Sequence, residues 1–176
     1  AWGIANDPAA APEAMQLTIT RVLEMQRYDG SFGLWDAHSE TEPWLSGFAM
    51  DFLTRARERG LEVSSTAYAN GLKWLVNHSQ SYRDDTPSQL ASRAYAFYVL
   101  AKARSGDLGA LRYLFDNYGY RVPSGLADAQ MGAAFALYGD QPRAAAAFKL
   151  ALDRVERRSY EADDYGTLLR DLAAIA

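Results

Sequence analysis

The sequence predicts an all-α fold made of consecutive antiparallel helical hairpins. Apolar residues recur at helical spacing along most of the 176-residue chain. Short polar, Gly- or Pro-containing stretches separate these segments, and no segment alternates polar and apolar residues for long enough to form a strand. Helices that follow one another across short turns pack antiparallel. We therefore expect an array of helical hairpins without a sheet.

Each expected helix has a stripe of apolar residues, and several have a start or stop signal. The first stripe runs from Met15 to Leu23. Pro43 suits the first turn of the second helix, and Gly60 can adopt the left-handed conformation that ends it. Ser65 is a plausible N-cap for the third. The expected helices span residues 12–25, 43–59, 65–77, 87–105, 108–115, 125–138, 141–157 and 164–175.

The composition is that of a globular domain with an acidic balance. Hydrophobic residues make up 49% of the chain and charged residues 23%, with a net charge of −4. A nucleic-acid binder needs a basic face, so we expect no nucleic-acid partner. The sequence contains no cysteine, which excludes disulfides and thiolate chemistry within these residues. No apolar run approaches the ~20 residues that span a membrane.

No catalytic or metal-binding constellation is visible, so we expect neither an enzyme nor a cofactor. Acidic pairs at positions 84–85 and 163–164 fall at loops or helix starts, where carboxylates stabilise the helix N-terminus. His38 and His78 are the only histidines, and two ligands do not make a zinc site. The chain also lacks a glycine-rich phosphate loop and a G-x-S-x-G nucleophile elbow.

One connection is unusual because it is long and rich in aromatic residues. It runs from about Gln26 to Pro43 and contains Tyr28, Phe32 and Trp35, with Trp44 just beyond it. Large aromatic side chains are costly to leave in water. Two interpretations stay open: the aromatic residues attach the loop to the helices, or they line a binding surface.

Three further residues of this loop are expected to shape its turn. The side chain of Asp29 can bond to its own backbone, and Gly30 accepts a positive φ. The amide of Gln26 can bridge the loop and a helix. We interpret all three as a structural motif.

The order of elements around this loop resembles the thioester domain of bacterial alpha-2-macroglobulins, which are relatives of the complement proteins. The resemblance rests on the stretch Gln26–Trp35, on the helix that starts Pro43-Trp44-Leu45-Ser46-Gly47-Phe48, and on the ending Asp164–Asp171. The loop also resembles the Gln–Trp repeats of squalene-type cyclases. Those enzymes need an acidic motif, and the related prenyltransferases need a zinc site, neither of which is visible here.

The resemblance implies an α/α-toroid, a ring of helical hairpins that is incomplete here because opening helices are missing. It implies that residues 1–176 form one domain, a fragment of a larger periplasmic protein that is membrane-anchored through its parent and serves host defence. The implied function is non-enzymatic inhibition of proteases by trapping. The implied partners are the other domains of the parent macroglobulin and, through it, target proteases.

The covalent form of trapping needs a Cys-x-x-Gln thioester, which this chain cannot form. In the family that motif lies ahead of a segment that Trp2-Gly3-Ile4 resembles. Two explanations stay open: the chain begins after the motif, or its parent lost it. If a thioester is present in the parent, Tyr28, Phe32, Trp35 and Trp44 are candidates for shielding it; otherwise they are structural.

His38 is a candidate acyl-transfer assistant, because complement-type relatives place a histidine after the same Gln-x-x-Asp-Gly loop. The alternative is an exposed loop histidine. A second function also stays open, since Gly106-Asp107 and Gly139-Asp140 mark a repeat of 33 residues. Residues 91–157 could thus form a tetratricopeptide-like protein-binding module. An incomplete ring would expose apolar edges, so self-association of the chain is also expected.

Overall fold

The computed structural model describes residues 11–81, 86–157 and 168–175, and these residues are mainly helical. Within these ranges the only β-type pairings are two isolated bridges, so the all-α prediction is confirmed. Every expected helix is present, although residues 164–167 of the last one lie outside the described residues. The elements are α1 (Ala11–Glu24), α2 (Pro43–Glu58), α3 (Ser65–Ser79), α4 (Pro87–Lys102), α5 (Leu108–Tyr118), the 3-10 turn η1 (Gly119–Arg121), α6 (Gly125–Leu137), α7 (Gln141–Arg157) and α8 (Leu168–Ile175).

Two helix ends differ from expectation for local reasons. The N-cap of α3 is Ser64 rather than Ser65, because the Ser64 hydroxyl accepts the bond from Ala67 N–H. α4 ends at Lys102, earlier than position 105. Arg104 adopts a φ of 54°, and the next N–H, of Ser105, turns back to the carbonyl of Leu100. This is a Schellman-type ending on a non-glycine residue.

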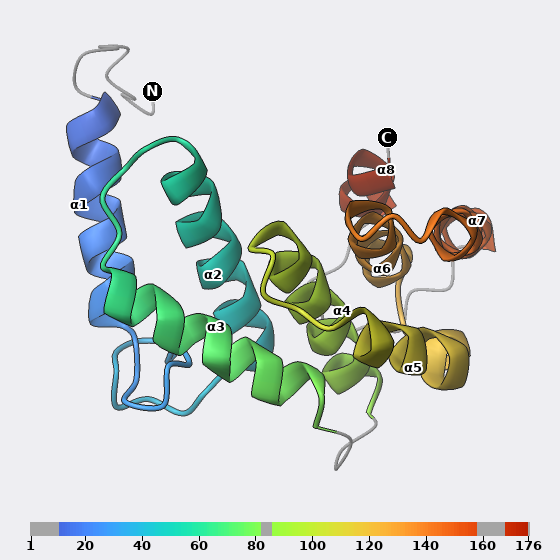
Figure 1. Cartoon of the computed structure of the whole chain (residues 1–176), viewed down its shortest axis with the longest axis horizontal. Helices are drawn as coiled ribbons and strands as arrows, with labels where there is room; N and C mark the ends of the chain where they lie inside the picture. The colour runs from blue at the N-terminus through green and yellow to red at the C-terminus, as the bar shows by residue number, and fades with distance from the viewer. Residues whose placement is uncertain (1–10, 82–85, 158–167, 176) are drawn as a thin grey trace.

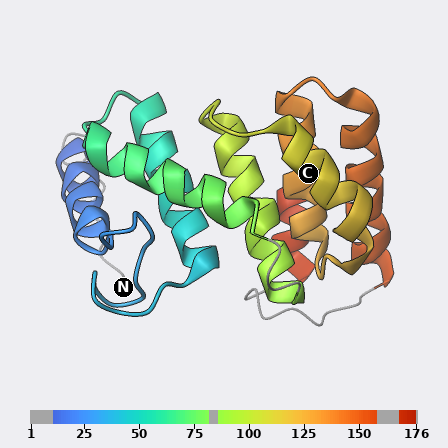
Figure 2. The same cartoon turned by 60° about the horizontal axis from the view of Figure 1, so that its bottom comes forward.

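The helices form an inner and an outer layer. The inner helices α2, α4, α6 and α8 contact one another in sequence order, while α1, α3, α5 and α7 pack against them from outside. Both views place α1–α3 at one end of the molecule and α5–α8 at the other, with α4 between them (Figures 1 and 2). Alternation of inner and outer helices defines an α/α-toroid, and α1 and α7 lie at opposite ends of an open arc.

Helix α4 joins two hydrophobic cores. Its residues Tyr95, Ala96, Val99 and Leu100 belong to the core shared with α1, α2 and α3. The other side of α4, which includes Phe97, contributes to the core shared with α5, α6 and α7. This double burial explains why α4 has no polar stripe: from Leu90 to Ala101, only Tyr98 is not fully buried.

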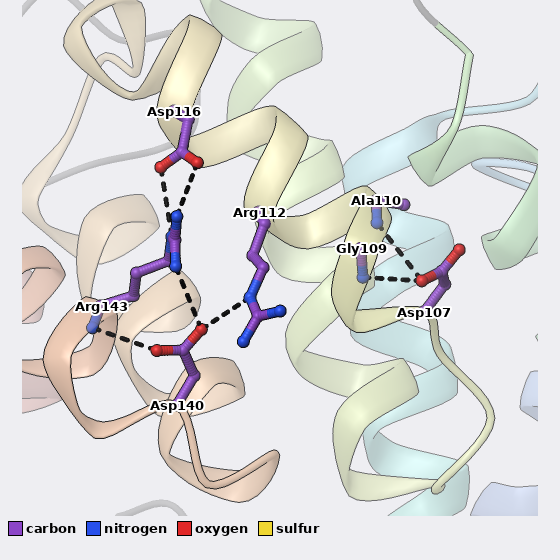
Figure 3. Close-up of polar contacts among 7 residues, drawn as sticks. All are labelled: Asp107, Gly109, Ala110, Arg112, Asp116, Asp140 and Arg143. Atoms are coloured by element: carbon purple, nitrogen blue, oxygen red, sulfur yellow. Dashed lines mark hydrogen bonds and ion pairs between the residues drawn. The ribbon is translucent and has the colours of Figure 1, made fainter.

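An ion-pair network fixes α5 against the start of α7 (Figure 3). Arg143 on α7 bonds both oxygens of Asp116 on α5, at 2.8 and 3.2 Å. Asp140, which precedes α7, accepts a 2.8 Å bond from Arg112 on α5 and a longer one from Arg143 N–H. Asp107 likewise accepts bonds from the first N–H groups of α5. The repeated Gly-Asp pair therefore marks two capped helix starts.

None of the helices that the structure describes is both long and apolar enough to cross a membrane.

Candidate functional site

The connection from α1 to α2 is a folded loop with its own backbone hydrogen bonds. Isolated bridges pair Gln26 with Phe32 and Gly33 with Thr41. Gly33 N–H donates to Met25 O at 3.1 Å, and Arg27 N–H donates to Ser31 O at 2.9 Å. The loop thus doubles back on itself beside the end of α1.

The three expected turn residues lie together at the tip of this loop. Gln26 Nε2 donates to Gly30 O at 3.2 Å and to Ala67 O of α3 at 2.9 Å. Asp29 Oδ1 accepts bonds from the N–H and the hydroxyl of Ser31. Gly30 has a φ of 93°, and a Cβ there would overlap the carbonyl of Asn70. The loop tip is therefore in close backbone contact with α3.

Ser46 is a site residue that sequence reasoning missed. It is fully buried in α2, and its hydroxyl accepts a 3.0 Å bond from Phe32 N–H while donating to Glu42 O at 2.9 Å. Because Ser46 lies four residues after Glu42, its hydroxyl can donate to the Glu42 carbonyl one turn back. Nothing in the local sequence pattern indicates the bond that it accepts from Phe32.

The four candidate aromatic residues do not form one cluster. Phe32 is 1% exposed and belongs to the core, whereas Tyr28 is 93% and Trp35 79% exposed. Trp44 is half-buried and stacks on Phe48 with ring centroids 5.7 Å apart. Phe32 and Trp44 therefore pack against the helices, while Tyr28 and Trp35 face solvent on a well-bonded loop.

His38 lies on the exposed outer part of the loop. Its backbone N–H donates to Asp36 Oδ1 at 2.8 Å. This bond is the main reason that the pKa of Asp36 is lowered, and Ser39 adds further bonds. Among the described residues, the imidazole lines none of the three hollows found on the surface.

An apolar hollow of about 210 Å³ lies between the loop, α1 and α2. Its walls include Val22, Phe32 and Phe52, and its partly exposed rim includes Met25 and Phe48. Thr18 supplies its single hydroxyl. We call this the loop-side hollow. Such a surface can cover an apolar segment or exclude water, but it offers no nucleophile or general base.

Two titratable groups in the interior, His78 and Tyr95, have structural partners. The pKa of His78 is lowered to about 4 by burial and by Arg93, and its ring shares a 2.9 Å hydrogen bond with Ser92 Oγ. Burial, followed by the nearby carboxylate of Asp51, raises the pKa of Tyr95. In the described part of the chain no three His, Cys, Asp or Glu side chains gather into a group that could hold a metal.

Comparison with known proteins identifies the domain. The family described as "A-macroglobulin TED domain" matches residues 6–88. An alpha-2-macroglobulin of Escherichia coli strain K12 is 37% identical over 98% of this chain. The chain belongs to the alpha-2-macroglobulin family. It spans about a tenth of that relative's length, 11%.

Solved macroglobulin structures show the same fold. The crystal structure of a Salmonella alpha-2-macroglobulin reacted with methylamine matches 98% of this chain and 12% of that one, with a TM-score of 0.87 and 35% identity. Trypsin-activated alpha-2-macroglobulin from Escherichia coli matches 90% of this chain and 11% of that one, with a TM-score of 0.79 and 36% identity. Because these matches run through residues 91–157, that segment is part of the macroglobulin domain, and the tetratricopeptide-like interpretation has no separate support.

Proposed function

We propose that this domain serves a periplasmic, membrane-anchored macroglobulin that traps proteases, and that it helps to keep the thioester region of its parent dry until activation. The observation that carries the proposal is similarity along nearly the whole chain to alpha-2-macroglobulins, one of which was solved in a trypsin-activated form. The domain supports trapping and has no turnover of its own. Its partners are the other domains of the parent and the trapped proteases.

The loop-side hollow is the surface that we assign to shielding. An activated acyl group must be kept from water until it is triggered, and a dry apolar wall does this. The hollow has such a wall, and the hydrogen bond from Phe32 to Ser46 holds one side of it in place. Met25 and Phe48 at its rim are available to contact another segment of the parent.

The test incubates the parent macroglobulin with trypsin, measures retained trypsin by size-exclusion chromatography, and detects covalent adducts by denaturing electrophoresis. We expect trypsin to be retained and, if the parent carries a thioester, a high-mass adduct that methylamine treatment beforehand abolishes. Phe48→Ser should speed spontaneous loss of adduct-forming capacity. Leu137→Ser is the matched control, since Leu137 is 55% and Phe48 53% exposed and Leu137 lies on α6 away from the hollow.

Failure of the parent to retain trypsin in any form would overturn the proposed function. Retention with equal decay rates for Phe48→Ser and the wild type would overturn the shielding role alone. The two outcomes are therefore separate.

For His38 we propose the acyl-transfer role that its place after the Asp29-Gly30 turn implies. Its exposed position leaves the imidazole accessible to an incoming group. In a thioester-bearing parent, His38→Asn should slow adduct formation. Equal conjugation rates for both proteins would show that His38 is only a loop residue.

A further inference from the structure

A second hollow, of about 360 Å³, lies at the inner face of the arc. Among the described residues, its lining comes from the inner helices α2, α4, α6 and α8. Helix α6 contributes one face of small and medium residues, including Ala129 and Ala133. These small side chains lie across from the aromatic residues of α2 and α4 and leave the space open. We call this the inner hollow.

Aromatic rings form the opposite wall. The Trp44 ring stacks on Phe48, and its centroid lies 5.7 Å from that of Tyr95. The Tyr95 ring stacks on Tyr98, with the two centroids 6.4 Å apart. All four rings line the inner hollow. Tyr95 is held by a hydrogen bond from its hydroxyl to Asp51. The wall is thus preorganised and suited to a flat or branched apolar group.

The charges at this hollow favour an anion. Asp51 is the single acid among the described residues of the lining and is largely buried, with 8% exposure. Its carboxylate already pairs with Lys102 at 2.8 Å and with Arg55 at 3.1 Å. Two cations therefore share one carboxylate. Because these two cations neutralise Asp51, the described lining offers no unpaired carboxylate to a cationic ligand.

Arg55 is the group best placed to hold an anion. It bonds Asp51 through Nε alone, and its side chain is 55% exposed. In the described part of the chain no hydrogen bond engages its two terminal nitrogens. A guanidinium presents parallel N–H groups that match a carboxylate.

We propose that the inner hollow binds a carboxylate that carries an aryl or branched alkyl group, with the apolar part against the aromatic wall and the carboxylate on Arg55. Its volume lies at the low end of the ~300–1,000 Å³ typical of ligand clefts. Two sources share this chemistry: the C-terminal residue of a peptide and a free small acid. The proposal goes beyond protease trapping and does not depend on it.

The experiment titrates the ¹⁵N-labelled 176-residue chain with three probes and follows the indole N–H of Trp44 by NMR. The probes are 3-phenylpropionate, the tetrapeptide Ala-Ala-Ala-Phe and the same tetrapeptide with a C-terminal amide. We expect saturable shifts with at least one carboxylate probe and at least tenfold weaker binding of the amide. Binding of the peptide alone would identify a chain terminus as the source, and binding of both acids would show that a small acid suffices.

Arg55→Gln should weaken binding of the carboxylate probe by about tenfold, as expected for loss of a hydrogen bond to a charged group. Arg59→Gln removes the same charge from an exposed residue next to α2 that does not line the hollow, and it should bind like the wild type. Ala133→Phe should fill the hollow and reduce binding without a change of charge. Circular dichroism checks that each variant is folded.

Three results would each overturn the proposal: no saturable shift with any carboxylate probe, equal binding of acid and amide, or equal binding by Arg55→Gln and the wild type.

Discussion

The backbone N–H of Phe32 donates a 3.0 Å hydrogen bond to the Oγ of Ser46, fourteen residues later in the chain. Both residues are buried, so water cannot replace the bond if it is lost. Through this contact the aromatic loop is attached to α2 from within the core. The position of the loop therefore depends on this hydroxyl group, together with the bond from Gln26 to Ala67 of α3 and apolar packing.

Ser46→Ala should destabilise the domain, because it leaves the N–H of Phe32 buried without a partner. An unsatisfied buried donor costs about 1–3 kcal/mol. Urea unfolding followed by circular dichroism measures the change. Ser88→Ala, at an exposed position of α4, is the control and should be nearly neutral. A variant as stable as the wild type would show that the bond contributes little.

Gly30→Ala should destabilise the domain more than Gly60→Ala does. Both glycines have a positive φ, 93° and 77° respectively, so both variants suffer backbone strain of about 1–2 kcal/mol. A Cβ at Gly60 enters open space, whereas one at Gly30 overlaps the Asn70 carbonyl. The difference between their free energies of unfolding isolates this overlap. Equal losses would mean that the loop tip can move away from α3.

The helices could be predicted from the sequence because each carries its own apolar periodicity and most begin at a capping residue. Asp107 and Ser124 accept bonds from the first N–H groups of α5 and α6. The end of α4 could not be predicted, since Arg104 takes a conformation that sequence rules assign to glycine. The predicted end of this helix at position 105 is therefore three residues later than its observed end at Lys102.

The loop and the inner hollow show where sequence reasoning stops. Aromatic composition indicated that the loop was special, but it could not separate buried Phe32 from exposed Tyr28 and Trp35. That separation depends on contacts with α2 and α3. Beside the inner hollow, Asp51 pairs with Lys102, fifty-one residues away, and no local sequence pattern predicts that pair.

The chain should self-associate through the loop-side hollow. Phe48 is a 53% exposed aromatic residue at its rim, and burying such a group against a second copy is favourable. Phe48→Asp should therefore shift the mass measured by light scattering toward the monomer. Leu137→Asp changes a residue of similar exposure on α6 and should leave the mass unchanged. A wild-type chain that stays monomeric at high concentration would contradict this prediction.

Asp140→Asn should be less stable than the wild type at neutral pH. The difference between their stabilities should shrink as the pH falls through the folded-state pKa of Asp140. Hydrogen bonding from Arg112 is the main cause of the lowered pKa of Asp140, and Arg143 adds to it (Figure 3). A carboxyl whose pKa is lower in the folded state contributes stability at neutral pH, and that stability is lost as pH falls through the folded-state pKa. Thermal unfolding of wild type and Asp140→Asn at neutral and acidic pH measures the difference. A gap that widens in acid would contradict the argument.

Asp128 should have the opposite effect to Asp140 on how the stability of the domain changes with pH. It is fully buried on α6, pairs with Arg154 of α7 at 2.5 Å, and has one carboxylate oxygen without a hydrogen bond among the described residues. Burial raises its pKa from 3.8 to about 7, and Arg154 only partly offsets this. Between these values the folded state holds a proton that the unfolded chain has released. The free energy of unfolding therefore falls as pH rises, by up to about 1.4 kcal/mol per pH unit.

Asp128→Asn cannot titrate, so it should remove this decline. Its free energy of unfolding minus that of the wild type should rise steadily with pH between the two pKa values and level off above about 7. Urea unfolding across that interval measures the slope for both proteins. Glu13→Gln, on the exposed face of α1, controls for the loss of one negative charge and should track the wild type. A difference that stays constant or falls with pH would mean that Arg154 keeps Asp128 ionised, and the pair would then stabilise the contact between α6 and α7 throughout this range.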